Sequence, residues 1–439
     1  MSLNWLLNQF LMWLAFIWSN TKVEIKVLGG AREVGGSCLS VETDSCKIAL
    51  DYGIKLDEEP KKLPTDFDAV IISHAHLDHT GSLLSLSKHN PTIVGAGITR
   101  DVTVDLLHDM VKIQNEQGKF DYEDQHAERI GQCWCVQDSI AVAGTKINLQ
   151  PAGHVAGAKV TSLEAEGKKI VYTGDICLHD TEILHGCKLE ALPKRPDVLI
   201  TESTYGGKIR APRQQLLDEF MEDLLKTMDN KGNVLIPTFA FHRSQEMAKR
   251  IDTAIANGYL PRYNVYTISN LAHKISDYYN HNKQLFTKEI RKQKTPFKYK
   301  HVKHLYRTAQ IQEPAIVICT SGFGHAGASL HLLKEWAENE HNSVILTSGY
   351  LPPDSPLKTA KEEKFFKIEE ETYNVKALVK QIELSGHADQ NQLVEIINKL
   401  KPTRTVLVHG DIEQAELLSE RIGEMTDVCI PQQNETIDI

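Results

Sequence analysis

The feature that most constrains this chain is a run of metal-binding side chains directly after an apolar segment. Residues 73–81 read S-H-A-H-L-D-H-T-G, so three histidines and an aspartate fall within six positions. Residues 69–72 are apolar and predict a buried strand that ends where the run begins. Imidazole and carboxylate groups both suit Zn²⁺. At the end of a strand, this spacing can point several ligand side chains toward one cavity. The pattern therefore favours a metal site over a solvated polar turn.

Further candidate ligands recur after other predicted strands. They are His154 in P-A-G-H-V-A-G, Asp175 in Y-T-G-D and His409 in V-L-V-H-G-D. Each alone is weak evidence, because loop histidines and turn aspartates are common. Together with the first run they provide enough ligands for two metal ions, which can share a hydroxide and hold a phosphoryl centre. Asp51, in A-L-D-Y-G, also follows an apolar strand, where a buried carboxylate can orient a ligand histidine.

The composition limits where and how the protein works. Its 439 residues allow two or three domains. The net charge is −9, so binding to nucleic acid needs a local basic surface, because phosphate contacts act locally. Eight cysteines are scattered without a C-x-x-C pair. This pattern predicts reduced thiols and a cytoplasmic location.

The N-terminal segment 5–18 reads W-L-L-N-Q-F-L-M-W-L-A-F-I-W. It lacks the basic region and the small-residue cleavage site of a signal peptide. It is also short for a membrane span, which needs about 20 residues. Contact with a partner subunit, shallow contact with a membrane surface and a start-site artefact remain the alternatives.

The pattern of predicted elements changes near Gly207. Before it, strands alternate with helices around the candidate ligands. After it, an amphipathic helix is predicted over residues 214–228, and short buried strands near 233–238, 264–268, 315–319 and 344–347 alternate with further helices. This pattern predicts a compact α/β insertion with its own parallel sheet, which ends near Glu383.

The ligand motifs resemble those of the metallo-β-lactamase superfamily. Glu202 in L-I-T-E-S-T-Y-G and His387 in L-S-G-H-A-D resemble motifs of its nucleic-acid branch, the β-CASP nucleases. The similarity is to cleavage and polyadenylation endonuclease-like and RNase J-like members, without a KH or C-terminal accessory domain. It implies an α/β fold, an αββα sandwich with an inserted α/β domain. The expected parts are an apolar extension (1–20), the metallo-β-lactamase domain (21–207 and 384–439) and the β-CASP domain (208–383).

The resemblance also implies roles for the site residues. It assigns two zinc ions to each chain, one held by His74, His76 and His154 and the other by Asp78, His79 and His409, with Asp175 as the bridge. The implied catalytic residues are Asp78, His387 and Glu202. His387, steadied by Glu202, would protonate the leaving oxygen or hold the scissile phosphate.

The implied function is a zinc-dependent ribonuclease that hydrolyses phosphodiester bonds of single-stranded RNA in RNA processing or decay. The alternatives are a DNA nuclease of the same superfamily and a non-catalytic RNA-processing subunit. His409 resembles the residue of RNA-processing members, whereas DNA-repair members usually have an apolar residue there. All seven candidate ligands are present, which disfavours a non-catalytic role. Endonuclease and 5′-to-3′ exonuclease modes both occur among relatives and stay open, as does a homo-oligomer.

Two segments of the insertion are candidates for RNA contact. The turn T-S-G-F-G-H-A-G, with Ser321 and Gly322, exposes backbone N–H groups that suit a phosphate. In the segment 283–307, basic and aromatic residues alternate. Its lysines Lys292, Lys294, Lys298 and Lys300 can follow a phosphate backbone while Phe286, Phe297, Tyr299 and Tyr306 stack on bases. A solvated charged face is the alternative.

Two loops of the insertion depart from the family pattern. Relatives often have S-G-M-L-x-G-G where Ser321–Gly327 reads S-G-F-G-H-A-G. They often have a G-T-x-G-R-like loop where Leu351–Lys361 reads L-P-P-D-S-P-L-K-T-A-K. These loops help to shape the substrate groove, so the departures bear on cleavage mode and sequence preference.

Overall fold

The computed structural model describes residues 22–55, 62–116 and 122–439. The apolar N-terminal extension lies outside the described residues. The chain divides into two compact units: unit 1 is the chain up to Leu178 with Gly186–Ile209 and His387–Ile439, and unit 2 is His179–His185 with Arg210–Gly386. The domain boundaries expected from the sequence stay a prediction. None of the helices in the described part of the chain is long and apolar enough to cross a membrane.

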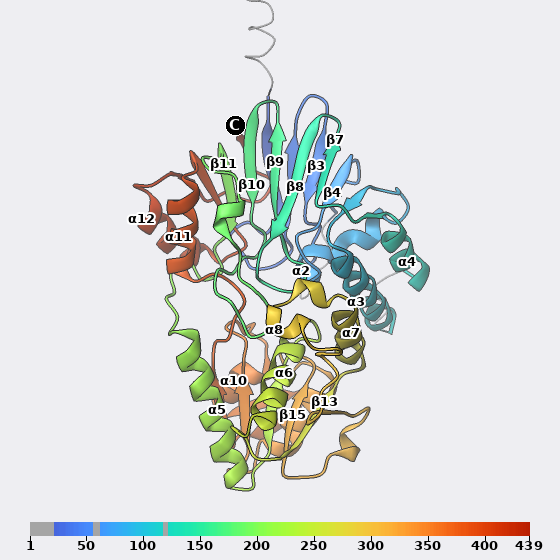
Figure 1. The fold of residues 1–439 in the computed structure, drawn as a ribbon, viewed down its shortest axis with the longest axis vertical. Coiled ribbons are helices and arrows are strands. Elements are labelled where there is room, and N and C mark those ends of the chain that lie inside the picture. Colours follow the sequence, from blue (N-terminus) through green and yellow to red (C-terminus); the bar gives the residue numbers. More distant parts are fainter. Residues whose placement is uncertain (1–21, 56–61, 117–121) are drawn as a thin grey trace, which may run out of the picture. The chain divides into compact units, whose positions relative to one another are not determined.

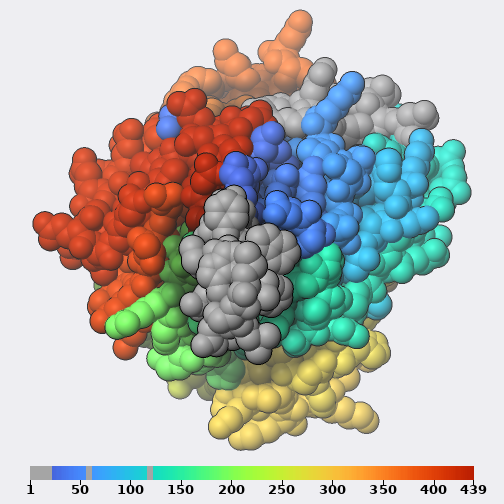
Figure 2. Space-filling model, turned by 90° about the horizontal axis from the view of Figure 1, so that it is seen from above, coloured from blue at the N-terminus to red at the C-terminus, as the bar shows by residue number. Residues whose placement is uncertain are grey.

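Unit 1 is built on two seven-stranded sheets. In the first, antiparallel strands give way to parallel ones, in the order β22 (Thr436–Asp438), β1 (Glu24–Gly29), β2 (Cys38–Glu42), β3 (Lys47–Leu50), β4 (Ala69–Ile71), β5 (Ile93–Val94) and β6 (Trp134–Cys135). The pairing of β22 with β1 brings the two ends of the described chain together. Blue and red residues accordingly lie side by side on one face (Figure 2).

The second sheet also combines antiparallel and parallel strands. Its order is β21 (Asp427–Cys429), β20 (Arg404–Val408), β11 (Val198–Glu202), β10 (Lys168–Tyr172), β9 (Lys159–Ala165), β8 (Thr145–Pro151) and β7 (Ser139–Val142). Strands β10, β11, β20 and β21 are parallel. The inner faces of both sheets share one apolar core, which includes Ile48 from the first sheet and Leu149 and Ile200 from the second.

Helices cover the outer faces of this sandwich. On the first sheet, α3 (Gly97–Glu116) and α4 (Asp124–Gln132) bury Leu107 and Ile130 in a second apolar cluster. Beside the second sheet lie α11 (Gln390–Leu400) and α12 (Ile412–Ile422) (Figure 1). The short helix α2 (Leu77–Thr80) follows β4. The expected αββα sandwich is confirmed.

Unit 2 holds a six-stranded sheet in which every pairing is parallel. Its order is β14 (Lys303–His304), β13 (Asn264–Ile268), β15 (Ala315–Cys319), β12 (Val234–Pro237), β16 (Ser343–Leu346) and β19 (Leu378–Gln381). The other elements are α5 (Arg213–Asp229), α6 (Arg243–Ala256), α7 (Asn270–His281), α8 (Lys288–Arg291), α9 (Gly327–Trp336), α10 (Pro356–Glu362) and the hairpin β17 (Phe365–Ile368) and β18 (Glu371–Asn374). The expected α/β insertion with its own parallel sheet is confirmed.

Candidate metal centre

The candidate ligands of unit 1 come from segments that follow its strands. Strands β4, β8, β10 and β20 each run into such a segment, and β10 and β20 both lie parallel to β11, so they end at the same edge of the sheet. His409 and Asp51 directly follow β20 and β3 with φ values of 47° and 59°. Left-handed backbone costs a residue with a side chain about 1–2 kcal/mol, and such strain collects at functional sites.

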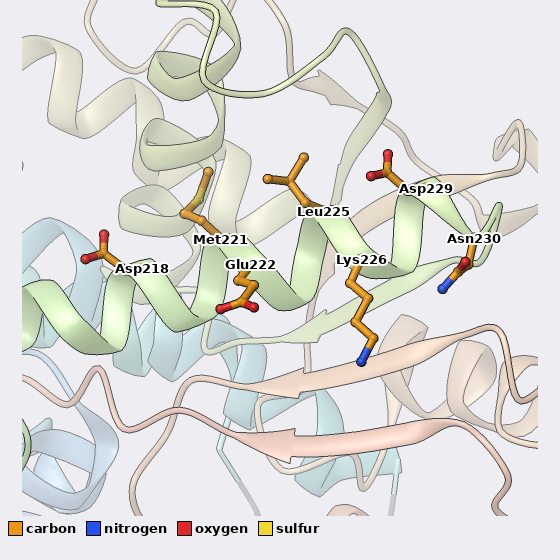
Figure 3. Close-up of a pocket in the computed structure, with 7 residues that line it drawn as sticks. All are labelled: Asp218, Met221, Glu222, Leu225, Lys226, Asp229 and Asn230. Atoms are coloured by element: carbon orange, nitrogen blue, oxygen red, sulfur yellow. The ribbon is translucent and has the colours of Figure 1, made fainter.

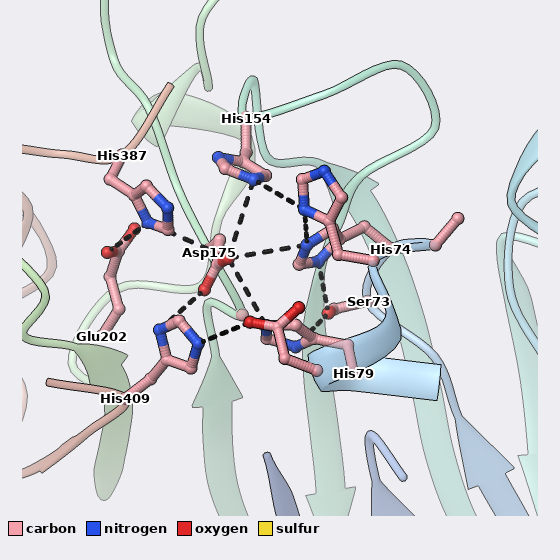
Figure 4. A network of polar contacts seen from close by, with 12 residues as sticks. Ser73, His74, His79, His154, Asp175, Glu202, His387 and His409 are labelled. Carbon is pink, nitrogen blue, oxygen red and sulfur yellow. Dashed lines mark hydrogen bonds and ion pairs between the residues drawn. The ribbon is translucent and has the colours of Figure 1, made fainter. Parts of the chain in front are cut away.

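The first group of donor atoms comes from His74, His76, His154 and Asp175, whose ligand atoms all lie within 4.8 Å of one another. Nε2 of His74 is 2.9 Å from Nδ1 of His76. The Oδ2 atom of Asp175 lies 3.5 Å from Nε2 of His74 and 3.6 Å from Nε2 of His154. Figure 4 shows Asp175 at the centre of this network.

The second group consists of Asp78, His79 and His409. Nε2 of His409 is 3.2 Å from Oδ2 of Asp78, and Nε2 of His79 is 3.4 Å from Oδ2 of Asp175. The other carboxylate oxygen of Asp175, Oδ1, is 3.4 Å from Nδ1 of His409. Asp175 therefore contacts both groups and lies between them in the network (Figure 4).

Asp51 fixes the orientation of the His79 ring through the ring nitrogen that faces away from the centre. It is fully buried, and its Oδ2 atom lies 2.7 Å from Nδ1 of His79. It also accepts hydrogen bonds from the backbone N–H and the hydroxyl of Ser73, both at 2.7 Å, and from the Tyr172 hydroxyl at 2.6 Å. Nδ1 of His79 is thus engaged, and Nε2 is the nitrogen that faces the centre.

The turn that carries Asp175 requires glycine. Gly174 has a φ of +52°, and a Cβ atom on it would lie 2.6 Å from Cβ of Ser73. Both the backbone conformation and the close approach exclude a larger residue. This contact places Asp175 beside the ligands that follow β4.

Burial and charge set the protonation of the donors. Burial and the nearby His79 hold the pKa of His74 well below its ordinary value, and burial together with His154 lowers the pKa of His76 to about 3. Neutral imidazoles have a free lone pair, which a metal needs. Burial alone would raise the pKa of Asp175, but His409 and His79 outweigh it and hold the carboxyl ionised.

The buried polar atoms fit a bound metal. Nε2 of His79 and Oδ1 of Asp175 have no hydrogen-bond partner among the described residues, although both are buried. Orphaned buried polar atoms are costly unless they serve an ion or water. The donors are imidazole nitrogens and carboxylate oxygens, which is the set that zinc accepts.

Glu202 and His387 form a separate pair at the edge of the centre. Oε2 of Glu202 lies 2.8 Å from Nδ1 of His387, and Oε1 accepts the backbone N–H of Ile176 at 2.8 Å. Burial alone would lower the pKa of His387, but the charges of Glu202 and Asp175 outweigh it and raise the pKa to about 9. These residues also lie close enough to Asp175 and His409 to form a third group of metal donors.

Three residues that hold the site in place were not predicted from the sequence. Ser73 and Tyr172 hold Asp51, and the Thr204 hydroxyl donates to the carbonyl oxygen of His409 at 3.0 Å. Each lies within or next to a motif, in S-H-A-H, Y-T-G-D and E-S-T-Y. Their position within or beside these motifs could have indicated a supporting role. Hydroxyl groups next to such motifs are too common, however, for these three to be selected from the sequence.

The candidate RNA-contact residues lie in unit 2. Lys292, Lys294, Lys298 and Lys300 are exposed, and none of them forms an ion pair with another described residue. The stacking role expected for the neighbouring aromatic residues is wrong for Phe286 and Phe297, which are 1% and 3% exposed in the core around Tyr279. Tyr299 is also largely covered and donates to the Gln245 carbonyl oxygen, whereas Tyr306 is 69% exposed. Ser321 is half-buried and Gly322 is buried.

A hollow of about 590 Å³ along α5 in unit 2 does not suit RNA. Its charged lining is mainly acidic, with three carboxylates and one lysine projecting from the helix (Figure 3): Asp218, Glu222, Asp229 and Lys226. Such a surface repels a polyanion.

Comparison with known proteins identifies the family. Three family descriptions match successive parts of the chain: a beta-lactamase superfamily domain over residues 55–210, a Beta-Casp domain over 244–355 and a Zn-dependent metallo-hydrolase RNA specificity domain over 372–431. The chain is 30% identical to Integrator complex subunit 11 of Gallus gallus, across 95% of this chain and 74% of that protein. The chain belongs to the β-CASP nucleases of the metallo-β-lactamase superfamily.

Other β-CASP relatives agree with this assignment. Identity is 28% to RNase aCSPSF2 of Saccharolobus solfataricus, across 94% of this chain and 85% of that protein. It is 32% to cleavage and polyadenylation specificity factor 73 of Drosophila melanogaster, across 89% of this chain and 60% of that protein. A crystal structure of a protein of unknown function from Enterococcus faecalis shares the fold, with a TM-score of 0.58 at 15% identity, over 95% of this chain and all of the other.

Family membership settles the class of activity. The β-CASP chain is a zinc-dependent, RNA-specific nuclease with an intact cluster of histidine and aspartate ligands. The expected family, fold and enzyme class are therefore confirmed.

Proposed function

We propose that the protein hydrolyses phosphodiester bonds of single-stranded RNA with two zinc ions per chain. The observation that carries this proposal is the pair of donor groups that share Asp175. His74, His76 and His154 would hold one ion, Asp78, His79 and His409 the other, and Asp175 would bridge them. Asp51 would hold the His79 ring in the orientation that a ligand needs.

Zinc, when bound, supplies Lewis acidity and lowers the pKa of water. The chain's own residues complete the chemistry. The Glu202 carboxylate lies 2.8 Å from Nδ1 of His387, so it orients the ring and favours its protonated form. A protonated imidazole at this point can give its proton to the leaving oxygen or hold the scissile phosphate. Neither role needs a covalent intermediate.

Substrate binding would depend on unit 2. Lys292, Lys294, Lys298 and Lys300 offer an exposed basic surface on an acidic protein, and lysines that follow a phosphate backbone suit single strands. The turn with Ser321 and Gly322 lies between β15 and α9, where backbone N–H groups suit a phosphate.

The names of its relatives and the pattern of its cysteines support proposals for the partners and the location of the enzyme. One of the relatives is by name a subunit of the Integrator complex, and another is a cleavage and polyadenylation specificity factor. We therefore infer that partner subunits, or further copies of this chain, assist the protein in RNA processing or decay. Its eight cysteines are scattered along the sequence without a C-x-x-C pair, which supports a reducing, cytoplasmic location.

The test combines metal analysis with product mapping. Elemental analysis of protein purified without chelator should find about two zinc ions per chain. End-labelled RNAs with a 5′-monophosphate or a 5′-hydroxyl are then incubated with the protein and resolved at single-nucleotide resolution. Internal cuts would identify an endonuclease, and mononucleotides released from the 5′ end an exonuclease. Protein without bound metal, or RNA left intact by zinc-loaded protein, would contradict the proposal.

A further inference from the structure

Thr204 lies where two loops that carry site residues of unit 1 meet. It follows β11, and His409 follows the neighbouring strand β20. The two strands are parallel, and their register pairs Glu202 with Val408, which brings the residues after them side by side. Thr204 is 7% exposed and His409 is 3% exposed, so their polar groups depend on protein partners rather than on water.

The residues beside Thr204 and His409 hold the two loops together. The backbone N–H of Ser203 donates to the Val408 carbonyl oxygen at 2.8 Å, and the Ser203 hydroxyl donates to the same oxygen at 3.1 Å. A Cβ atom on Gly410 would lie 2.4 Å from the Ser203 hydroxyl oxygen, so the loops approach each other closely. The Thr204 side chain is thus held against His409 by the backbone on either side.

The Thr204 hydroxyl contacts His409 at two points. Its oxygen lies 3.0 Å from the carbonyl oxygen of His409 and 3.3 Å from Nδ1 of the His409 ring. A carbonyl oxygen can only accept a hydrogen bond, so the single hydroxyl hydrogen of Thr204 belongs to that contact. In the other contact, Nδ1 must then carry the hydrogen and donate it to the hydroxyl oxygen, which still has a free lone pair.

Two neighbouring groups do not compete for this contact. The Thr204 hydroxyl oxygen is also 3.5 Å from Nδ1 of His387, but that nitrogen has a nearer partner in Glu202, at 2.8 Å. Oδ1 of Asp175 is 3.4 Å from Nδ1 of His409, yet this oxygen has no hydrogen-bond partner among the described residues. The acceptor for Nδ1 of His409 is therefore the Thr204 hydroxyl.

A hydrogen on Nδ1 leaves the lone pair of the neutral His409 ring on Nε2. This second nitrogen lies 3.2 Å from Oδ2 of Asp78, in the second group of donor atoms. His79, in the same group, is arranged in the same way, because Asp51 engages its Nδ1 and leaves Nε2 to face the centre. In histidine ligands, the hydrogen bond of one ring nitrogen decides which nitrogen binds the metal.

We propose that Thr204 is a positioning residue of the second zinc site. Its hydroxyl accepts from Nδ1 of His409, fixes the hydrogen of the neutral ring on that nitrogen and so directs Nε2 to the metal. This inference rests on the proposed function, which assigns His409 to a zinc ion. A neutral hydroxyl is a weaker acceptor than the Asp51 carboxylate behind His79, because hydrogen bonds to ionised groups are roughly twice as strong. Loss of the Thr204 hydroxyl should therefore weaken the zinc site without abolishing it.

The experiment measures the affinity of the protein for each zinc ion by competition with a chromogenic chelator. Thr204→Val keeps the branched shape of the side chain and removes the hydroxyl. It should bind one of the two ions about 10–100-fold more weakly, the usual effect of losing a residue that orients a ligand, and the other ion as tightly as wild type. Thr204→Ser keeps the hydroxyl and should bind both ions like wild type. Added zinc should restore RNA cleavage by Thr204→Val.

The controls separate the hydroxyl from packing and this inference from the proposed function. Thr405, a buried residue of β20 whose hydroxyl donates to Thr426, offers a matched change, and Thr405→Val should bind both ions like wild type. If Thr204→Val does not fold, Thr204→Ala removes the same hydroxyl without added bulk and should show the same weaker binding. Wild-type affinity for both ions without the hydroxyl, or equal weakening in Thr204→Ser, would overturn the inference. Wild-type protein that binds no zinc would contradict the proposed function itself.

Discussion

At the residue scale, the metal centre depends on which nitrogen or oxygen each side chain presents. His76 lies beside His74 and His154 and shares the first donor group with Asp175. The sequence predicts that these donors lie together, because donors that directly follow strands collect at the edge of a sheet. Their role as ligands stays a prediction. The sequence does not predict Ser73 or Tyr172, because their hydroxyl groups matter only through contact with a carboxylate distant in the chain, Asp51.

His76→Ala tests the first donor group. With one of three histidines removed, zinc should fall from about two ions per chain to about one, and RNA cleavage should be abolished. The melting temperature should stay near that of wild type, because His76 is only partly buried. His331→Ala removes an exposed histidine that pairs with Glu335 and should keep both ions. Full zinc content in His76→Ala would remove this residue from the ligand set.

His387→Ala tests whether catalysis can be separated from metal binding. The variant should keep both zinc ions and cleave RNA about 10²–10⁴-fold more slowly, since that is the usual contribution of general acid catalysis. Glu202→Gln should show a smaller loss, because the carboxylate only orients and charges the imidazole. Zinc content and cleavage rate are measured on the same preparations. Loss of a zinc ion from His387→Ala would make His387 a ligand rather than an acid.

At the element scale, a buried ion cluster joins α5 to α6. Glu246 is 4% exposed and forms ion pairs with Arg213, on α5, and with Arg243. Burial alone would raise the pKa of Glu246, but the two guanidinium groups outweigh it and hold the pKa below its ordinary value. Helical periodicity predicted α5, but the cluster itself was not predicted, because charged residues usually remain on the solvated face.

Glu246→Gln should lower the free energy of unfolding by about 3–5 kcal/mol, because two partly buried guanidinium groups, each on a side chain that is 15% exposed, lose their buried counter-charge. The depressed pKa also sets a pH dependence: the stability from Glu246 is present above its unfolded pKa of about 4.3 and is lost as pH falls from there through the lower pKa of the folded state. Denaturant unfolding at several pH values checks both effects. Glu222→Gln, an exposed position on α5, should have little effect. Equal acid sensitivity in wild type and Glu246→Gln would show that this cluster does not control acid stability.

The segment 283–307 shows where prediction from the sequence fails. The alternation of basic and aromatic residues over 283–307 predicted base stacking, but Phe286 and Phe297 fill the core beside Tyr279. A buried ring and a stacking ring look alike in a sequence. Conversely, the edge-to-face contact between Phe239 and Phe323 joins residues more than eighty positions apart, and only strand order brings them together.

At the scale of the whole molecule, an acidic protein must bind a polyanion. The net charge of −9 makes local basic surfaces decisive. Replacing Lys292, Lys294, Lys298 and Lys300 with Gln should weaken RNA binding and flatten its salt dependence, by about 0.7 in log–log slope for each phosphate that a lysine neutralises in the wild type. Zinc content should be unchanged, because no candidate ligand lies in the described part of unit 2. RNA binding is measured from low to high salt. If the log–log slope of the quadruple variant equals that of the wild type, these lysines form a solvated face and do not contact RNA.

The two-group metal centre is expected to hydrolyse RNA in preference to DNA, and a comparison of the two substrates measures this directly. Matched single-stranded RNA and DNA oligomers of one sequence are incubated with zinc-loaded protein, and initial cleavage rates are taken from end-labelled products. We expect RNA to be cut and DNA to be cut far more slowly, with neither cut by His76→Ala. Cleavage of DNA at an equal or faster rate would show that the metal centre is not specific for RNA.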